Sequence, residues 1–204
     1  MGTVDRTIVI ITFAHCGTTM LAGALEILGV PMVGENYHRM KWEDHDIIAT
    51  LKDENEEQFA ALIAERNQQH SMWGFKYPGA WKFMPLMKTY LRNPVYLGIF
   101  KDPISVTRRR FGKSNDRYLR KIRNTIRQYK YAMDGIYACG VPVHFFSYQK
   151  AIASPYKFVL EVIEAAGLDV DESDKRVDNA INYIQPNHKG PRRRYPSVEA
   201  WITQ

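Results

Sequence analysis

Cysteine is scarce in this sequence of 204 residues, which contains only Cys16 and Cys139. The two cysteines lie far apart, and neither has histidine or cysteine neighbours at zinc-ligand spacing, so we expect neither a disulfide framework nor a metal site. The sequence also lacks any apolar stretch of about 18 residues, the length that a membrane-spanning helix needs. The first apolar run is only about six residues long, too short for a signal peptide. These absences predict a soluble cytoplasmic protein.

The sequence is also low in acidic residues. Its 22 Asp and Glu are outnumbered by 28 Lys and Arg, which gives a formal net charge of +6. Such a balance favours anionic partners, which include nucleic acid, a membrane surface and phosphorylated small molecules, and charge alone does not choose among them. At this length one domain over residues 1–204 is expected, burying roughly 70% of its unfolded surface. Internal repeats and low-complexity tracts are not found.

Apolar runs alternate along the chain between the lengths and periods of strands and helices. Strands that alternate with helices predict an α/β fold, in which a mostly parallel central sheet is covered by helices on both faces. From about residue 186 the chain is rich in Pro, Lys and Arg, and we expect an irregular basic C-terminal segment. The expected strands are 7–13, 31–33, 73–77, 95–100 and 141–147, and the expected helices are 18–28, 47–69, 103–111, 114–138 and 155–166.

The loop after the first expected strand has the composition of an anion-binding site. It contains His15, Cys16 and Gly17, and a helix is expected to begin at Thr18 and Thr19. Free N–H groups at a helix N-terminus attract anions, glycine permits close approach to the backbone, and the two hydroxyls add donors. An alternative stays open, in which Thr18 only caps an ordinary helix.

Two familiar phosphate chemistries do not fit this loop. The loop of ATP- and GTP-hydrolysing proteins needs a first glycine and a lysine, but Thr12 and Thr18 stand at those positions. A cysteine-based phosphatase needs an arginine six residues after the cysteine, where this chain has Ala22. Cys16 is therefore interpreted as a small loop residue, although a helix N-terminus lowers a thiol pKa.

The loop Ala14-His15-Cys16-Gly17-Thr18-Thr19 resembles the 5'-phosphosulfate loop of sulfotransferases that use 3'-phosphoadenosine 5'-phosphosulfate (PAPS), usually written Pro-Lys/Arg-Ser-Gly-Thr-Thr. His15 replaces the basic residue of the family, so its contact with the sulfate is expected to be weaker and dependent on pH. Further segments that resemble the family, mostly its bacterial branch, follow in the same order over about residues 7–195. They are Gly34-Glu35, Trp42-Glu43-Asp44, Trp73-Gly74-Phe75-Lys76-Tyr77-Pro78, Phe100-Lys101-Asp102-Pro103 with Arg109, and Lys189-Gly190-Pro191-Arg192-Arg193-Arg194.

The resemblance implies a P-loop-like three-layer α/β/α fold and transfer of a sulfuryl group from PAPS to a hydroxyl or amine. Such a transfer relies on positioning and charge stabilisation, and its nucleotide leaving group needs no metal. In these terms the loop residues His15, Cys16, Gly17, Thr18 and Thr19 bind the 5'-phosphate and the sulfate. Lys76 stabilises the bridging oxygen, and the 3'-phosphate is held by Lys101, Arg109, Arg192, Arg193 and Arg194.

The acceptor also needs a general base. The resemblance favours Glu35, with Glu43 second, while His38, Asp44 and His45 are nearby competitors. Lys76 has an alternative interpretation as a surface lysine beside a turn, and Asp102-Pro103 as a helix start. The acceptor itself, a small molecule or a glycan, is not encoded in these motifs.

A strongly basic helix is expected between Arg108 and Lys130, with Asp116 as its only acid. The common outcome for such a helix is a solvated face whose other side packs on the core, and the alternative is a polyanionic partner such as a glycan. Nucleic acid is not expected, because nothing indicates aromatic side chains exposed for base stacking. The apolar residues at near-helical spacing that would face the core are Leu119, Ile122, Ile126, Tyr129 and Met133. Two other functions therefore stay open beside sulfuryl transfer: a kinase-like phosphotransferase with a degenerate loop, and a non-catalytic polyanion-binding domain. The acidic helix with Asp53, Glu54, Glu56 and Glu57 is expected to be a solvated face or a lid.

Overall fold

A four-stranded, fully parallel sheet forms the centre of the molecule in the computed structural model, which describes residues 5–34, 42–111 and 118–184. The strands lie in the order β2-β1-β3-β4, with bounds β1 Arg6–Ile11, β2 Met72–Lys76, β3 Val95–Phe100 and β4 Val143–Ser147. Neighbouring pairs include Ile10 with Lys76 and Ile10 with Leu97. Since all four strands run the same way, their carboxyl ends meet at one edge of the sheet.

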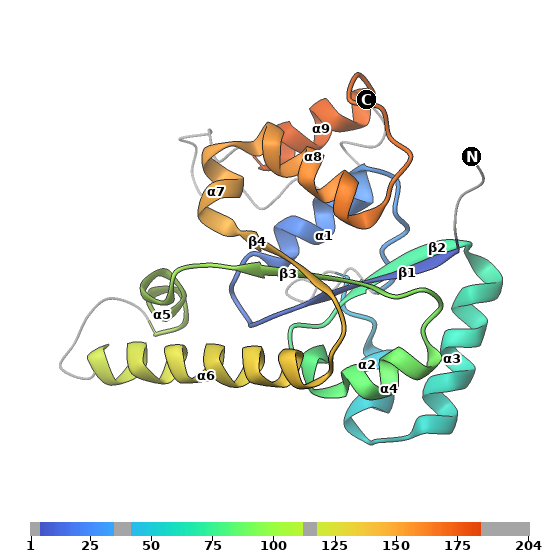
Figure 1. Ribbon diagram of the computed structural model, residues 1–204, viewed down its shortest axis with the longest axis horizontal. Helices are drawn as coiled ribbons and strands as arrows, with labels where there is room; N and C mark the ends of the chain where they lie inside the picture. The colour runs from blue at the N-terminus through green and yellow to red at the C-terminus, as the bar shows by residue number, and fades with distance from the viewer. Residues whose placement is uncertain (1–4, 35–41, 112–117, 185–204) are drawn as a thin grey trace.

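Strand β1 is apolar on both faces because it lies in the middle of the sheet. Ile8 and Ile10 belong to the hydrophobic cluster on one face, while Val9 and Ile11 belong to the cluster on the other. Figure 1 shows the two helical layers above and below the sheet. The three-layer α/β/α fold predicted from the sequence is therefore confirmed.

The upper layer in Figure 1 contains α1 Thr18–Ile27, α7 Tyr148–Ala153, α8 Pro155–Ala166 and α9 Lys175–Ile184. Helix α1 is almost wholly buried between the sheet and α9. The lower layer contains α2 His45–Lys52, α3 Glu56–Gln69, the 3-10 helix η1 Ala80–Phe83, α4 Met84–Tyr90 and α6 Tyr118–Ala138. Helix α5, Pro103–Phe111, follows β3 at the carboxyl edge and packs on α6.

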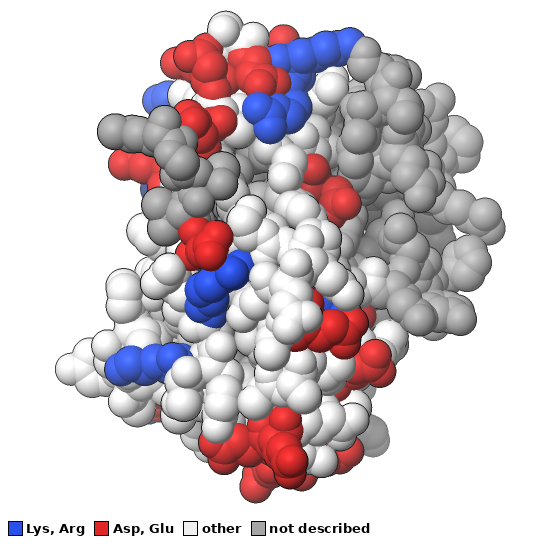
Figure 2. All heavy atoms as spheres, turned by 90° about the vertical axis from the view of Figure 1, so that its right-hand side faces the viewer, with Lys and Arg blue, Asp and Glu red and all other residues white. Residues whose placement is uncertain are grey.

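Several elements differ from the sequence-based expectations. Residues 31–33 form only an isolated bridge, Met32 with Gly74, instead of a strand. The helix expected over 47–69 is two helices, because Glu54 has a positive φ of 52° and the Asn55 side chain caps α3 by accepting from the amide of Gln58. The sequence interpretation had no counterpart for α4, α7 and α9. In Figure 2, which shows the α3 side, acidic side chains gather at the lower end, where the exposed α2–α3 turn lies.

The face of α6 that packs on the core was predicted correctly only in part, since Ile122 and Tyr129 are half-buried. The buried residues of the helix are Thr125, Ala132 and Ile136, whereas Leu119, Ile126 and Met133 are exposed. The Thr125 hydroxyl lies 2.9 Å from the Thr107 hydroxyl of α5, and small side chains such as Ala132 allow close helix packing. Among the described residues no helix is both long and apolar enough to cross a membrane.

Candidate active site at the carboxyl edge of the sheet

The loop between β1 and α1 lies at the carboxyl edge, and its last residue caps the helix. Gly17 is the N-cap of α1, with a left-handed φ of 107° and no side-chain capping bond. Thr18 is the first helical residue, so the alternative in which it caps the helix is wrong. A Cβ at Gly17 would overlap the ring of Tyr148, the first residue of α7. Glycine is therefore required at this position for two reasons, the positive φ and the close contact with Tyr148.

Cys16 is fully buried in this loop and is hydrogen-bonded to α6. Its Sγ lies 3.1 Å from the Tyr129 hydroxyl, which in turn donates to the carbonyl of Lys101 at 2.6 Å. A tyrosine hydroxyl has a single proton, so the Cys16 thiol is the donor in the first contact. Burial raises the pKa of the Cys16 thiol. Cys16 is a protonated structural residue, which agrees with the sequence interpretation.

Tyr129 joins three segments that are distant in the sequence. Its ring makes edge contacts with Phe13 of the loop at 5.2 Å and with Phe100 of β3 at 5.3 Å between centroids. Burial raises the pKa of its hydroxyl. The tyrosine therefore stays neutral and holds the loop, the end of β3 and α6 in one arrangement. We name the Cys16–Tyr129–Lys101 carbonyl chain the loop clasp.

Cationic groups gather on the β3 side of the loop, and we call Lys101, Arg109 and His15 the open cationic end. Lys101 Nζ lies 4.3 Å from the centre of the Tyr148 ring, a cation–π contact that brings it beside Gly17. Arg109 is exposed on α5. Partial burial, followed by the charges of Arg110 and Arg109, lowers the pKa of His15 from its usual value. The structure thus brings His15, Lys101 and Arg109 to one end of the site.

A hollow of about 450 Å³ lies at the ends of β3 and β4 beside these cations. Asp102 in its wall caps α5 by accepting from the Ser105 amide at 2.7 Å, and its other oxygen accepts from Gln149 at 2.6 Å. The helix-start interpretation of Asp102-Pro103 is therefore confirmed. The hollow is lined by Phe100, Lys101, Asp102, Phe145, Phe146, Ser147 and Gln149.

Lys76 and Glu43 lie at the other end of the loop and form what we call the ion-paired end. Lys76 Nζ is 2.6 Å from Glu43 Oε1, with the side chains only 3% and 15% exposed. The interpretation of Lys76 as a surface lysine is thus wrong. The next residues border the loop directly, because the Tyr77 amide donates to the Ile10 carbonyl and the Thr12 amide to the Pro78 carbonyl. Burial and the Glu43 charge raise the pKa of Tyr77.

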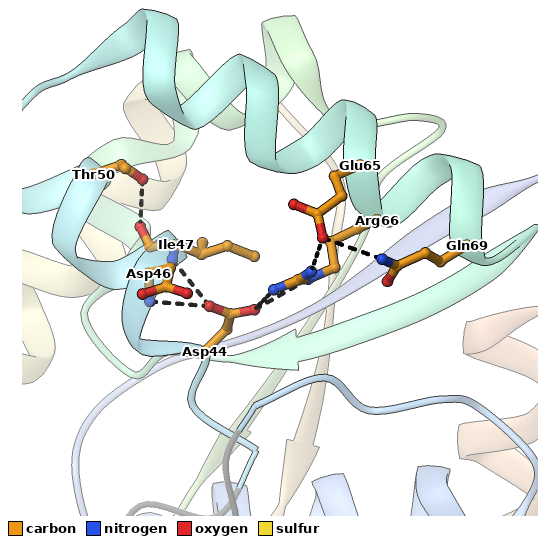
Figure 3. A network of polar contacts seen from close by, with 7 residues as sticks. All are labelled: Asp44, Asp46, Ile47, Thr50, Glu65, Arg66 and Gln69. Carbon is orange, nitrogen blue, oxygen red and sulfur yellow. Dashed lines mark hydrogen bonds and ion pairs between the residues drawn. The ribbon is translucent and has the colours of Figure 1, made fainter.

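Asp44, a competitor for the role of base, has a structural role (Figure 3). One of its oxygens caps α2 by accepting from the amides of Asp46 and Ile47, and the other lies 3.2 Å from Arg66 Nη2 of α3. These bonds occupy both oxygens and fix the start of α2 against α3. The preceding residue, Glu43, is thereby held where it reaches Lys76.

Some predicted site residues lie outside the described residues, namely Glu35, His38, Arg192, Arg193 and Arg194. Gly34 is described, and a Cβ there would overlap the backbone of Trp42 and Glu43, so the chain passes close to the ion-paired end. Sequence reasoning missed Tyr129 and Tyr148 as site residues. The sequence presented Tyr129 only as one of the residues of the basic helix that were expected to face the core. Within the described ranges, no three His, Cys, Asp or Glu residues are grouped as a metal site.

Comparisons with known proteins bear on the fold alone. No family model matches the chain, and no curated protein matches its sequence. A solved structure with a similar fold is the sulfotransferase domain from the Synechococcus PCC 7002 olefin synthase. It superposes with a TM-score of 0.57 at 13% sequence identity, over 88% of this chain and 78% of that domain. The architecture expected from the sequence resemblance is thus found in a sulfotransferase domain.

Proposed function

We propose that this protein transfers a sulfuryl group from PAPS to a hydroxyl or amine acceptor. The observation that carries the proposal is the arrangement around Gly17: an uncapped helix N-terminus between two separately held lysines, Lys76 and Lys101. A donor with a phosphosulfate at one end and a 3'-phosphate at the other needs positive charge at both places. The loop lacks the lysine of ATP-hydrolysing proteins, which fits a reaction with no metal-bound triphosphate.

Each end of the site has a role in this proposal. The first amides of α1, with the hydroxyls of Thr18 and Thr19, bind the 5'-phosphate and the sulfate. Lys101 and Arg109 bind the 3'-phosphate beside the hollow at the ends of β3 and β4, and we assign the C-terminal arginines the same task from the sequence alone. His15 adds a contact to the sulfate whose strength depends on its protonation.

The ion-paired end supplies charge stabilisation at the bond that breaks. Lys76 is held by Glu43 close to the loop, and in our proposal it moves toward the bridging oxygen as negative charge develops there. Glu43 then positions Lys76. We keep Glu35, the candidate favoured by the sequence, as the general base that takes the acceptor proton.

Calorimetric titration with 3'-phosphoadenosine 5'-phosphate, the desulfated donor, tests this proposal. Micromolar affinity is expected, and Lys101→Ala should weaken it about tenfold by removing a charged contact to phosphate, which is worth about 1.5 kcal/mol. Lys157→Ala is the matched control, because Lys157 is exposed on α8, which carries none of the residues assigned to the nucleotide. Thr18→Val should also weaken binding.

ATP with magnesium and AMP serve as competing ligands in the same titration. Preferential binding of ATP would replace our proposal with the kinase-like alternative. Absence of nucleotide binding, combined with salt-sensitive binding of heparin, would instead favour the polyanion-binding domain.

A further inference from the structure

Helix α6 carries an apolar stripe that no described helix or strand covers. Leu119, Ile126, Met133 and Tyr137 are 80%, 52%, 40% and 89% exposed. They follow one another at intervals of seven, seven and four residues, so they share one side of the helix. We call these four residues the α6 flank. Large apolar side chains are rarely grouped on a surface without a partner.

The α6 flank lies between the buried side of the helix and its charged outer side. Residues two positions apart lie on opposite sides of a helix, so Arg123 and Arg127 are opposite the buried Thr125, and Asp134 is opposite the buried Ala132. These outer residues are all exposed and charged. The apolar stripe is thus a side wall of α6 rather than its outermost ridge.

Neighbouring contacts show that this wall faces β4. Tyr129 lies within one turn of both Ile126 and Met133, and its ring contacts Phe100, whose ring lies 5.5 Å from that of Phe145 of β4. Phe145 is itself 44% exposed. Along the described chain β4 pairs only with β3, so no described strand lies at its outer edge. The stripe and Phe145 therefore border one lateral surface.

The charge of α6 identifies the chemistry of a partner. Helix α6 carries five basic residues and one acidic residue, Asp134, which forms an ion pair with Lys130 at 2.6 Å. Two copies of α6 laid together would repel each other, which disfavours self-association through this face. A lipid bilayer would meet the charged outer ridge before the lateral stripe. A single helix, about 10 Å wide, fits along the stripe with its own acids beside the basic residues. The cations are Arg120, Lys121, Arg123, Arg127 and Lys130.

We infer that the α6 flank is a docking surface for an acidic amphipathic helix of another protein. The inference does not depend on the proposed function, because it uses none of the residues assigned to nucleotide binding. The partner helix packs apolar residues at heptad spacing on Ile126 and Met133, while its acidic residues pair with Arg123 and Arg127. Both kinds of contact contribute to affinity.

Fluorescence anisotropy with the full chain tests this inference, using a labelled synthetic helix of about three heptads with Leu at the apolar positions and Glu elsewhere. We expect saturable micromolar binding, weakened at least tenfold by Ile126→Gln with Met133→Gln. A similar loss is expected from Arg123→Glu with Arg127→Glu. Tyr156→Gln and Lys157→Glu, exposed on α8, are the matched controls. Thermal unfolding of each variant verifies that it is folded.

Three results would overturn the inference. The first is no saturable binding of the acidic helix to the folded protein. The second is binding that tolerates the Ile126 and Met133 substitutions, or that persists when the Leu positions of the peptide are Gln, since the contact would then be electrostatic only. The third is tighter binding to phosphatidylserine vesicles than to the peptide, or a dimer in sedimentation that Ile126→Gln dissociates.

Discussion

The two ends of the candidate site hold positive charge in different ways. At the ion-paired end, Lys76 is buried and its ammonium is matched to the Glu43 carboxylate at 2.6 Å. At the open cationic end, Lys101 lies over the face of Tyr148, which attracts the cation without neutralising it. The buried charge of Lys76 contributes to the stability of the fold through its ion pair. The charge of Lys101 is not neutralised by Tyr148 and can bind an anionic ligand. Substitutions at the two ends should therefore separate stability from binding.

The largest effect is expected from Lys76→Met at the ion-paired end. The substitution leaves the Glu43 carboxylate largely buried without its partner, which should reduce the free energy of unfolding by about 3 kcal/mol. Urea denaturation measures this loss. The double variant Lys76→Met with Glu43→Gln should recover most of the stability but not the transferase activity. A single variant as stable as the parent protein would show that the pair does not form.

A smaller effect is expected at the loop clasp, which joins the loop to the end of β3 at Lys101. Tyr129→Phe keeps the ring contacts with Phe13 and Phe100 but removes the hydroxyl that bonds Cys16 and the Lys101 carbonyl. We expect a loss of about 1–2 kcal/mol in unfolding free energy. Binding of 3'-phosphoadenosine 5'-phosphate should weaken several-fold, because the loop and Lys101 lose their connection. Tyr131→Phe on the exposed side of α6 is the control, and equal effects of the two substitutions would contradict the clasp.

The smallest effect is expected at His15 of the open cationic end, where stability and nucleotide affinity should both depend on pH. The lowered pKa means that the folded protein binds this proton less readily than the unfolded chain, so the stabilising contribution of His15 is complete above pH 6.5 and is lost as pH falls toward the folded pKa. A bound anion favours the imidazolium, so nucleotide affinity should rise as pH decreases through the same range. His15→Lys should remove most of this pH dependence, and His144→Gln should retain it. Calorimetry between pH 5.5 and 8, approximately the range in which histidine titrates, provides the measurement.

Much of the fold was predictable because its central elements have strong local signals. β1, α1 and β3 are apolar runs bounded by glycine or a turn, and the structure places them within a residue or two of the expected bounds. α9 was missed although Val177, Ala180, Tyr183 and Ile184 recur at helical spacing on its buried side. The error in the core-facing side of α6 has a physical cause. Apolar residues at heptad spacing form one face of a helix, but the spacing does not show whether that face packs on the core or on another protein.

The candidate site likewise contains residues that the sequence predicts and contacts that it does not. Gly17, Lys76 and Lys101 lie in local motifs that the sequence displays, and the structure brings them to one edge of the sheet. The bond between Cys16 and Tyr129 joins residues 113 positions apart, and the one between Lys76 and Glu43 joins residues 33 apart. Such pairs depend on the strand order and on helix packing, which no local pattern specifies. The sequence consequently suggested Glu43 as a second candidate base, but not that it would hold Lys76.

The strand order has a consequence for how the chain is made. β1 leaves the ribosome before the other three strands of the sheet, yet its neighbours are residues 72–76 and 95–100. At roughly 5–20 residues per second, translation needs several seconds or more before both neighbours exist. During that time Ile8–Ile11, among the most apolar stretches of the chain, has both edges unpaired and is prone to aggregate. The strand that precedes the anion-binding loop is thus also a segment that a nascent-chain chaperone would protect from aggregation.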